Sequence, residues 1–263
     1  MLIPTSARLF HRVLPLLMAL SLAVGSIPLP AQTPASTAKP EKPTTAPAAT
    51  SGSNLHTPSD PELIREVQVD VREKDYVGLV WWIPFEFWQI SGAKRGIPAE
   101  STAQNLKALR DYTIVAVFLA KVSALGSFTF VPIEDLRRDV MLRDAAGNEY
   151  RSIPEPSQDA KNLAAIVKPI LTSAMGKAGE NFDMLFFPAR GKDGDVIADA
   201  ARKGRFEVVL KNNLAGVPES VYEWRTPLTA IAPLRYCPVG KERVHADWEY
   251  CPWHGVALEP ATK

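Results

Sequence analysis

The stretch IREVQVDVRE, residues 64–73, decides the class of the fold, and DYVGLVWWIPFEFWQI, residues 75–90, extends the same pattern. In the first stretch valines alternate with polar residues, which is the period of a strand with one buried face. The second stretch is apolar at almost every position and is therefore typical of a strand buried on both faces. Pro84 has no N–H to donate to a ladder, so we expect a bulge or an edge position there.

Further strand patterns continue to about residue 232. They are YTIVAVFLAKV (112–122), GSFTFVP (126–132), FDMLFFPA (182–189), GRFEVVLKN (204–212) and VYEWRTPLTAI (221–231). A hairpin is predicted over 138–153, with its turn at Ala146-Gly147-Asn148. Seven to nine strands without a regular βαβ alternation predict a mainly β fold, a β-sandwich, of which immunoglobulin-like domains are one form.

Two helices are expected as insertions between these strands. The first is STAQNLKALRDY (101–112), which a Ser101/Gln104 capping box would begin. The second is SQDAKNLAAIVKPILTSAMGK (157–177), with one apolar stripe and Ser157 as the N-cap. Pro169 removes one backbone hydrogen bond and should kink or split this helix.

The N-terminal 31 residues have the composition of a secretory signal peptide. Arg8 and Arg12 form a basic flank, the apolar run VLPLLMALSLAVG follows, and small residues precede a cleavage position after Ala31. A bilayer-spanning helix usually needs about 20 apolar residues, so anchoring by an uncleaved N-terminal segment is the alternative. We therefore expect an exported protein, periplasmic or extracellular, with no stable membrane span after signal cleavage.

Residues 32–61 are rich in Pro, Ala, Ser and Thr and predict a disordered linker. The β-sandwich domain would then span 62–232, and a small tail would span 233–258. Removal of Arg8 and Arg12 lowers the Lys and Arg total from 30 to 28 against 29 acids, so the net charge changes from +1 to −1. A near-neutral chain gives no indication of a nucleic-acid partner.

The large domain shows no motif of a known catalytic site. Residues 62–232 contain neither histidine nor cysteine, and nucleophile-elbow, Walker and zincin patterns are absent from the sequence. General acid–base chemistry there would depend on carboxylates, lysines or tyrosines. No spacing singles out a carboxylate pair, so we assign no catalytic residue.

Three other patterns in this domain have a structural and a functional interpretation. The aromatic cluster is either a binding platform or core, and we favour core; it comprises Trp81, Trp82, Phe85, Phe87 and Trp88. Asp193, Asp195 and Asp199 are either a calcium loop or turn residues, and the Asp-Gly dipeptide favours a turn. The basic run 202–205 is interpreted as a solvated turn.

The tail has the highest density of cysteine and histidine residues in the chain. RYCPVGKERVHADWEYCPWHG, residues 235–255, holds both cysteines, Cys237 and Cys251, and two of the four histidines, His245 and His254. YCPVGKE (236–242) and DWEYCPWHG (247–255) resemble a zinc ribbon, in which two CPxCG knuckles hold one zinc ion. The resemblance covers about 20 of 263 residues.

The zinc-ribbon resemblance implies three ligands, Cys237, Cys251 and His254. His245 would supply the fourth, and Asp247 is a weaker alternative. The first knuckle departs from the family pattern, because Gly240 follows Val239 as though one cysteine had been deleted. On this interpretation the cofactor is a structural Zn²⁺.

Two rival interpretations concern the same tail. CPWHG also matches the second box of a Rieske domain, but Val239 stands where the first box needs histidine. A Cys237–Cys251 disulfide would close a loop of about 15 residues and stabilise by roughly 3 kcal/mol. Export favours the disulfide and the placing of the histidines favours zinc, so both remain open, and two free thiols are the third alternative. Either a zinc ion or a disulfide would have a structural role, because so short a unit lacks a sufficient hydrophobic core of its own.

Two functions follow from this sequence. The first is a non-catalytic binding or assembly module of the cell envelope, whose partner is an unidentified protein or envelope polymer. The alternative is an exported hydrolase that acts on a polymer with carboxylates of the β-sandwich. A deep pocket with two facing carboxylates would favour the hydrolase, whereas an exposed apolar sheet face or edge strand would favour the binding module.

Overall fold

The computed structural model describes residues 60–258, except 74, 94–95, 97, 212–213, 215–218 and 234. The predicted signal peptide, and the predicted linker apart from its last two residues, lie outside the described residues. The helices are α3 (Asp60–Val67), α4 (Phe85–Ala93), α5 (Ala99–Asn105), η1 (Lys107–Asp111), α6 (Ile133–Asp139), α7 (Gln158–Met175) and α8 (Lys177–Glu180). The strands are β1 (Gln68–Glu73), β2 (Tyr76–Ile83), β3 (Tyr112–Val122), β4 (Phe128–Phe130), β5 (Val140–Arg143), β6 (Glu149–Arg151), β7 (Asp183–Pro188), β8 (Gly204–Leu210), β9 (Ser220–Thr226), β10 (Arg235–Tyr236) and β11 (Arg243–Val244).

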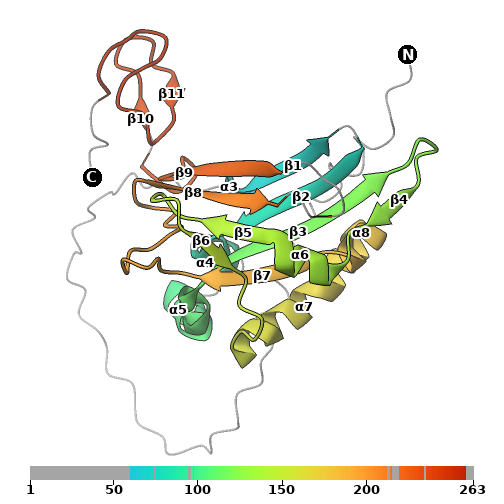
Figure 1. The fold of residues 1–263 in the computed structure, drawn as a ribbon. Helices are drawn as coiled ribbons and strands as arrows, with labels where there is room; N and C mark the ends of the chain where they lie inside the picture. Colours follow the sequence, from blue (N-terminus) through green and yellow to red (C-terminus); the bar gives the residue numbers. More distant parts are fainter. Residues whose placement is uncertain are drawn as a thin grey trace, which may run out of the picture.

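The chain is mainly β and forms several antiparallel sheets with few helices (Figure 1). The largest is a five-stranded sheet built around β3, which pairs with β2 along one edge. Along its other edge β3 pairs first with β7 and then with β4. A second sheet has four strands in the order β6-β5-β8-β9. All of these pairings are antiparallel, which confirms the coarse fold class expected from the sequence.

Side chains from both sheets enter one apolar core. Trp82 of β2 meets Phe206 of β8 edge to face, with ring centroids 4.8 Å apart. Phe206 stacks on its cross-strand neighbour Trp224 of β9 at 5.5 Å. Large aromatic side chains contribute most of the buried area in such contacts. The core interpretation of the aromatic cluster is therefore confirmed for Trp81, Trp82, Phe87 and Trp88, which are all buried, while Phe85 is half-buried.

Two segments that were predicted to be strands are partly helical. One starts inside a helix, and the other ends inside a helix. Residues 64–67 belong to α3, and the strand begins only at Gln68. Leu63, Ile64 and Val67 are buried together on one side of α3, a helical spacing that the valine alternation concealed. The strand predicted over 75–90 ends at Ile83, and α4 follows directly after Pro84.

The bulge or edge position predicted at Pro84 is wrong, because this proline lies between β2 and α4. A proline is well suited to the start of a helix, where its missing N–H costs no hydrogen bond. The capping box predicted at Ser101 is also wrong, because α5 already begins at Ala99. The predictions from sequence patterns were therefore wrong at the ends of helices and strands, which tertiary packing determines.

Helix α7 confirms its predicted N-cap but not a predicted split. The Ser157 hydroxyl accepts a hydrogen bond from the Ala160 N–H at 3.4 Å. The helix continues without interruption through Pro169 to Met175. Proline removes only one intrahelical hydrogen bond, and burial of Leu163 and Val167 secures the helix against the core on the N-terminal side of that position.

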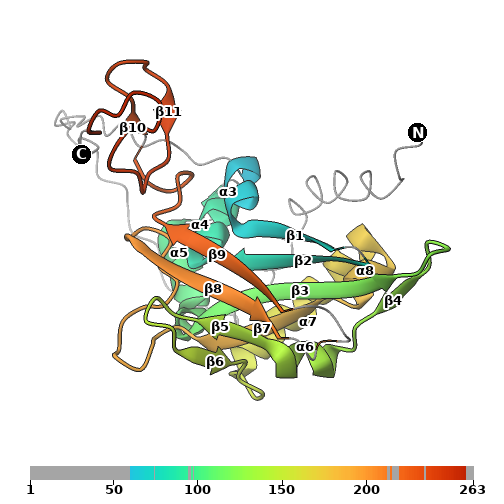
Figure 2. The same ribbon diagram turned by 45° about the horizontal axis from the view of Figure 1, so that its top comes forward.

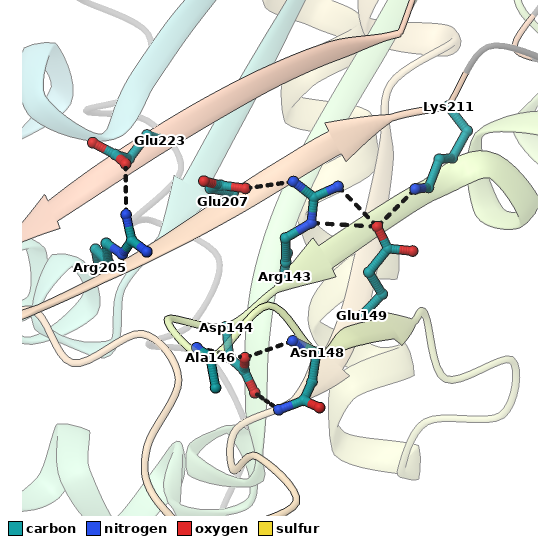
Figure 3. A network of polar contacts seen from close by, with 9 residues as sticks. All are labelled: Arg143, Asp144, Ala146, Asn148, Glu149, Arg205, Glu207, Lys211 and Glu223. Atoms are coloured by element: carbon teal, nitrogen blue, oxygen red, sulfur yellow. Dashed lines mark hydrogen bonds and ion pairs between the residues drawn. The ribbon is translucent and has the colours of Figure 1, made fainter.

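One face of the four-stranded sheet carries charged side chains that pair across the strands (Figure 3). Arg143 of β5 pairs with Glu149 of β6 at 2.9 Å and with Glu207 of β8 at 2.7 Å. Arg205 and Glu223 form a further pair between β8 and β9 at 3.8 Å. Each such pair contributes about 0–1 kcal/mol. This face is therefore polar, and it is not the exposed apolar sheet face that would favour a binding module.

Among the described residues, no helix is both long enough and apolar enough to cross a bilayer. The tail, with its small β10–β11 sheet, projects beyond the ends of the large sheets near α3 and β9 (Figures 1 and 2).

Candidate metal centre

The tail contains two turns of the same conformation, which we call the first knuckle (237–241) and the second knuckle (251–255). In the first, the Lys241 N–H donates to the Cys237 carbonyl at 3.0 Å; in the second, the Gly255 N–H donates to the Cys251 carbonyl at 2.8 Å. Lys241 and Gly255 both have a positive φ, 60° and 64°. The two knuckles therefore have equal length, and Gly240 occupies the position that His254 occupies in the second.

This equivalence corrects the interpretation that a cysteine had been deleted. No residue is missing from the first knuckle; glycine stands at the ligand position, and Lys241 takes the left-handed conformation that usually favours glycine. The Gly240 N–H lies 3.5 Å from the Cys237 sulfur, the amide-to-sulfur approach that zinc knuckles use. The two turns thus share one backbone conformation, although only the second carries a histidine at its fourth position.

Glu242 occupies the space that a side chain at position 240 would need. A Cβ built on Gly240 would lie 1.9 Å from Glu242 Oε2 and 2.6 Å from His254 Cε1. Cβ atoms do not approach other atoms so closely, so the carboxylate and a side chain at 240 exclude each other. Glycine at this position is what gives Glu242 access to the site.

Four side chains converge at this point: Cys237, Glu242, Cys251 and His254, each with one potential ligand atom within 4.8 Å of the others. His254 Nδ1 lies 3.4 Å from Cys237 Sγ, 3.5 Å from Cys251 Sγ and 3.1 Å from Glu242 Oε1. Both cysteines are buried. Two thiols, an imidazole and a carboxylate are a donor set that could hold a metal ion.

His245 lies outside this group. Its Nδ1 contacts the Asp247 carboxylate, and its ring lies 6.1 Å from that of Trp248. It follows β11 and lines a groove with residues of α3 and β9, including Glu66 and Arg225. The structure therefore brings together three of the four residues proposed as ligands, and it places Glu242 where we had expected His245.

Protonation of the ligand group would oppose metal binding. Burial raises the pKa of the Cys251 thiol, while hydrogen bonds from the His254 and Trp253 backbone N–H groups lower it. The pKa of Glu242 is lowered, first by a hydrogen bond from its own backbone N–H. A bound ion would need thiolates, so metal affinity should fall as the pH is lowered.

The tail is attached to the sheet domain by polar contacts. Arg243 of β11 pairs with Glu62 of α3 at 2.9 Å and donates to the Thr229 carbonyl at 3.1 Å. The Ala246 N–H donates to the Thr229 hydroxyl at 3.2 Å. These contacts hold the tail against the end of the sheet domain.

The outer surface of the tail exposes large apolar side chains. Tyr236, Val239, Tyr250 and Trp253 are 52%, 58%, 63% and 64% exposed. The Trp253 ring is supported at its edge by Trp248, with centroids 5.6 Å apart. Aromatic residues at such density on a unit of about 20 residues are typical of contact surfaces.

A separate cavity of about 270 Å³ lies where β2 and β3 meet α4 and the segment 189–200. Glu86 and Asp199 both line it, together with Arg110 and Arg190. Burial raises the pKa of Glu86 and the negative charge of Asp199 raises it further, while its own backbone N–H and Arg110 lower it.

Sequence reasoning missed Glu242, Glu86 and Asp199 as members of these sites. For Glu242 a signal existed: a glycine at a ligand position, followed two residues later by a carboxylate. For Glu86 and Asp199 there was none, because they are 113 positions apart and only the fold brings them to one cavity. No protein-family model, curated protein or solved structure matches this chain.

Proposed function

We propose that this chain is an exported, non-catalytic binding or assembly module of the cell envelope, a β-sandwich whose tail is held by one structural zinc ion. The observation that carries the proposal is the convergence of Cys237, Glu242, Cys251 and His254 within 4.8 Å. Zinc accepts thiolate, imidazole and carboxylate ligands in a tetrahedron, and four protein ligands leave no open position for substrate. The ion would therefore stabilise the tail and would not act on a ligand.

The zinc ion would fix the surface that meets the partner. Tyr250 directly precedes the second knuckle, Trp253 lies within it, and Val239 lies within the first knuckle. The conformation of the two knuckles therefore determines how these exposed side chains are presented. The Arg243 contacts then orient this surface relative to the sheet domain. Because the outer face of the four-stranded sheet is covered by ion pairs, the tail is the apolar contact surface that we propose for the partner.

The metal is tested by the mass of the purified mature protein under native and denaturing conditions, combined with thiol titration. We expect a zinc-sized adduct that is lost on denaturation, together with two titratable thiols. A mass two hydrogens below that of the reduced chain, without metal, would establish the Cys237–Cys251 disulfide and refute the zinc site. Glu242→Gln should weaken the adduct, and Glu249→Gln, an exposed glutamate of the same tail, is the matched control.

Binding is tested by co-sedimentation with purified, insoluble cell-wall polymer. We expect the protein to sediment with the polymer, and we expect Trp253→Ala to reduce the bound fraction while Val221→Ala, an exposed residue of β9, leaves it unchanged. Equal sedimentation of both variants and the wild type would exclude the tail surface as the binding site.

A second candidate function is the polymer-acting hydrolase, and one specific observation favours it. Two carboxylates, Glu86 and Asp199, line the cavity beside α4, and burial raises the pKa of Glu86, as a general acid requires. Release of soluble fragments from cell-wall polymer by the wild type, abolished in Glu86→Gln and Asp199→Asn, would establish this function. Absence of release at high enzyme concentration would eliminate it.

A further inference from the structure

Two carboxylates and two guanidinium groups of described residues line the cavity beside α4, and no ion pair joins any of these four groups to another. Among the residues that the structure describes, Glu86 forms no ion pair and no hydrogen bond with another side chain. It is half-buried in the first turn of α4. A carboxylate withdrawn from water without a cation is costly. A ligand that brings a positive group would remove this cost.

Arg110 is the complementary group at the same cavity. Its guanidinium lies 4.0 Å from the centroid of the Phe85 ring, and this cation–π contact holds it at the cavity wall. In the described part of the chain it forms no ion pair, although its charge acts on Glu86 and lowers the pKa of that carboxyl. Arg190 lines the cavity as well, and it donates a hydrogen bond to the Gly194 carbonyl at 2.8 Å.

The Asp199 carboxylate is held in place by backbone N–H groups that follow it in the chain. Its Oδ1 accepts hydrogen bonds from the Ala201 N–H at 2.9 Å and the Arg202 N–H at 3.1 Å. Its Oδ2 is 3.5 Å from the Arg202 guanidinium, which is largely exposed. The carboxylate therefore keeps its position at the cavity without full neutralisation. Trp88 contributes one more unsatisfied group, because its buried Nε1 has no hydrogen-bond partner.

The shape of the cavity discriminates between ligand classes. A volume of about 270 Å³ is at the small end of ligand pockets. Sugars usually stack on open aromatic faces, but Trp82 and Trp88 are only 1% and 4% exposed and Arg110 covers the Phe85 ring. A polysaccharide therefore lacks a stacking surface here.

We propose that this cavity binds a small zwitterion, an α-amino acid or a single amino-acid unit with free ammonium and carboxylate groups. The ammonium would lie between Glu86 and Asp199, and the carboxylate would pair with Arg110 and Arg190. Charge-assisted hydrogen bonds of this kind are roughly twice as strong as neutral ones. The inference concerns the same cavity as the second candidate function and is an alternative to it, because a polysaccharide lacks a stacking surface there.

The test is isothermal titration calorimetry on the full mature protein with three probes: L-alanine, N-acetyl-L-alanine and L-alaninamide. We expect L-alanine to bind at least tenfold more tightly than either derivative, because each derivative lacks one of the two charges. Equal binding of the three probes, or no binding of L-alanine up to millimolar concentration, would overturn the proposal.

Variants connect the binding to the cavity. Glu86→Gln and Arg110→Gln should each weaken L-alanine binding at least tenfold, whereas Lys107→Gln, exposed on the same short helix as Arg110, should leave it unchanged. Glu86→Gln removes a half-buried charge and should not unfold the protein; unchanged affinity in this variant would refute the site. Cys251→Ser removes the metal site and should not affect alanine binding, so the zinc proposal and the cavity proposal can fail independently.

Discussion

Replacing Gly240 by alanine tests the geometry of the ligand group most directly. The added Cβ would lie 1.9 Å from Glu242 Oε2 and 2.6 Å from His254 Cε1, so both side chains must move. Both contacts are with the ends of flexible, partly exposed side chains, so the shift itself should cost little stability. Because both displaced groups are proposed ligands, we expect zinc affinity to fall at least tenfold, about 1.4 kcal/mol. The assay is competition with a chromophoric chelator, together with thermal unfolding in the presence and absence of zinc.

The control is Gly255→Ala, at the last position of the second knuckle, which corresponds to Lys241 in the first. A Cβ at Gly255 meets nothing within 4 Å, but φ is 64°, so this substitution costs about 1–2 kcal/mol through the backbone alone. We expect it to lower the melting temperature while displacing no ligand. If Gly240→Ala bound zinc as tightly as the wild type, Glu242 would not be a ligand and the proposed site would be wrong.

Three further predictions concern the rest of the molecule. Arg243→Ala removes the contacts with Glu62 and Thr229 and should make the tail junction more sensitive to limited proteolysis without loss of metal; unchanged cleavage would mean that the tail is held otherwise. Burial raises the pKa of Glu86 above its ordinary 4.5, so wild-type stability should fall as the pH rises through that raised value. Glu86→Gln should therefore unfold at a higher temperature than the wild type at pH 7 but not at pH 3, and equal differences at both pH values would contradict this. Ser157→Ala should cost about 1 kcal/mol in urea unfolding through loss of the α7 N-cap, whereas Ser173→Ala, exposed on the same helix, should cost much less.

The strand content was predictable because the patterns of β3, β5, β7 and β8 are local. Each of these strands is a short apolar or alternating run that ends at turn residues. Prediction failed at α3 and α4, where apolar side chains satisfy both the strand and the helix periods and tertiary packing decides between them. Pro84 illustrates the ambiguity, since a proline can mark a strand edge or the start of a helix.

The candidate site was predictable only in part. Cys237, Cys251 and His254 were implied by the resemblance of two short segments to zinc-ribbon knuckles, which is a local property of the sequence. Choosing between His245 and Glu242 required the direction of each side chain, because both are close to the knuckles in sequence. The cavity between Glu86 and Asp199 could not have been found, since it depends on how α4 packs near residues 189–200.

The equivalence of the two knuckles has a consequence for how this site could evolve. Position 240 already has the backbone position of a ligand, and the amide and carbonyl hydrogen bonds of a complete knuckle surround it. A cysteine there would require both Glu242 and His254 to move, and it would add a third thiol to the group without a change in the length of the loop. One substitution therefore separates a carboxylate-containing donor set from a thiolate-rich one, so the kind of metal ion that such a group could hold would change by a point mutation in a loop of unchanged length.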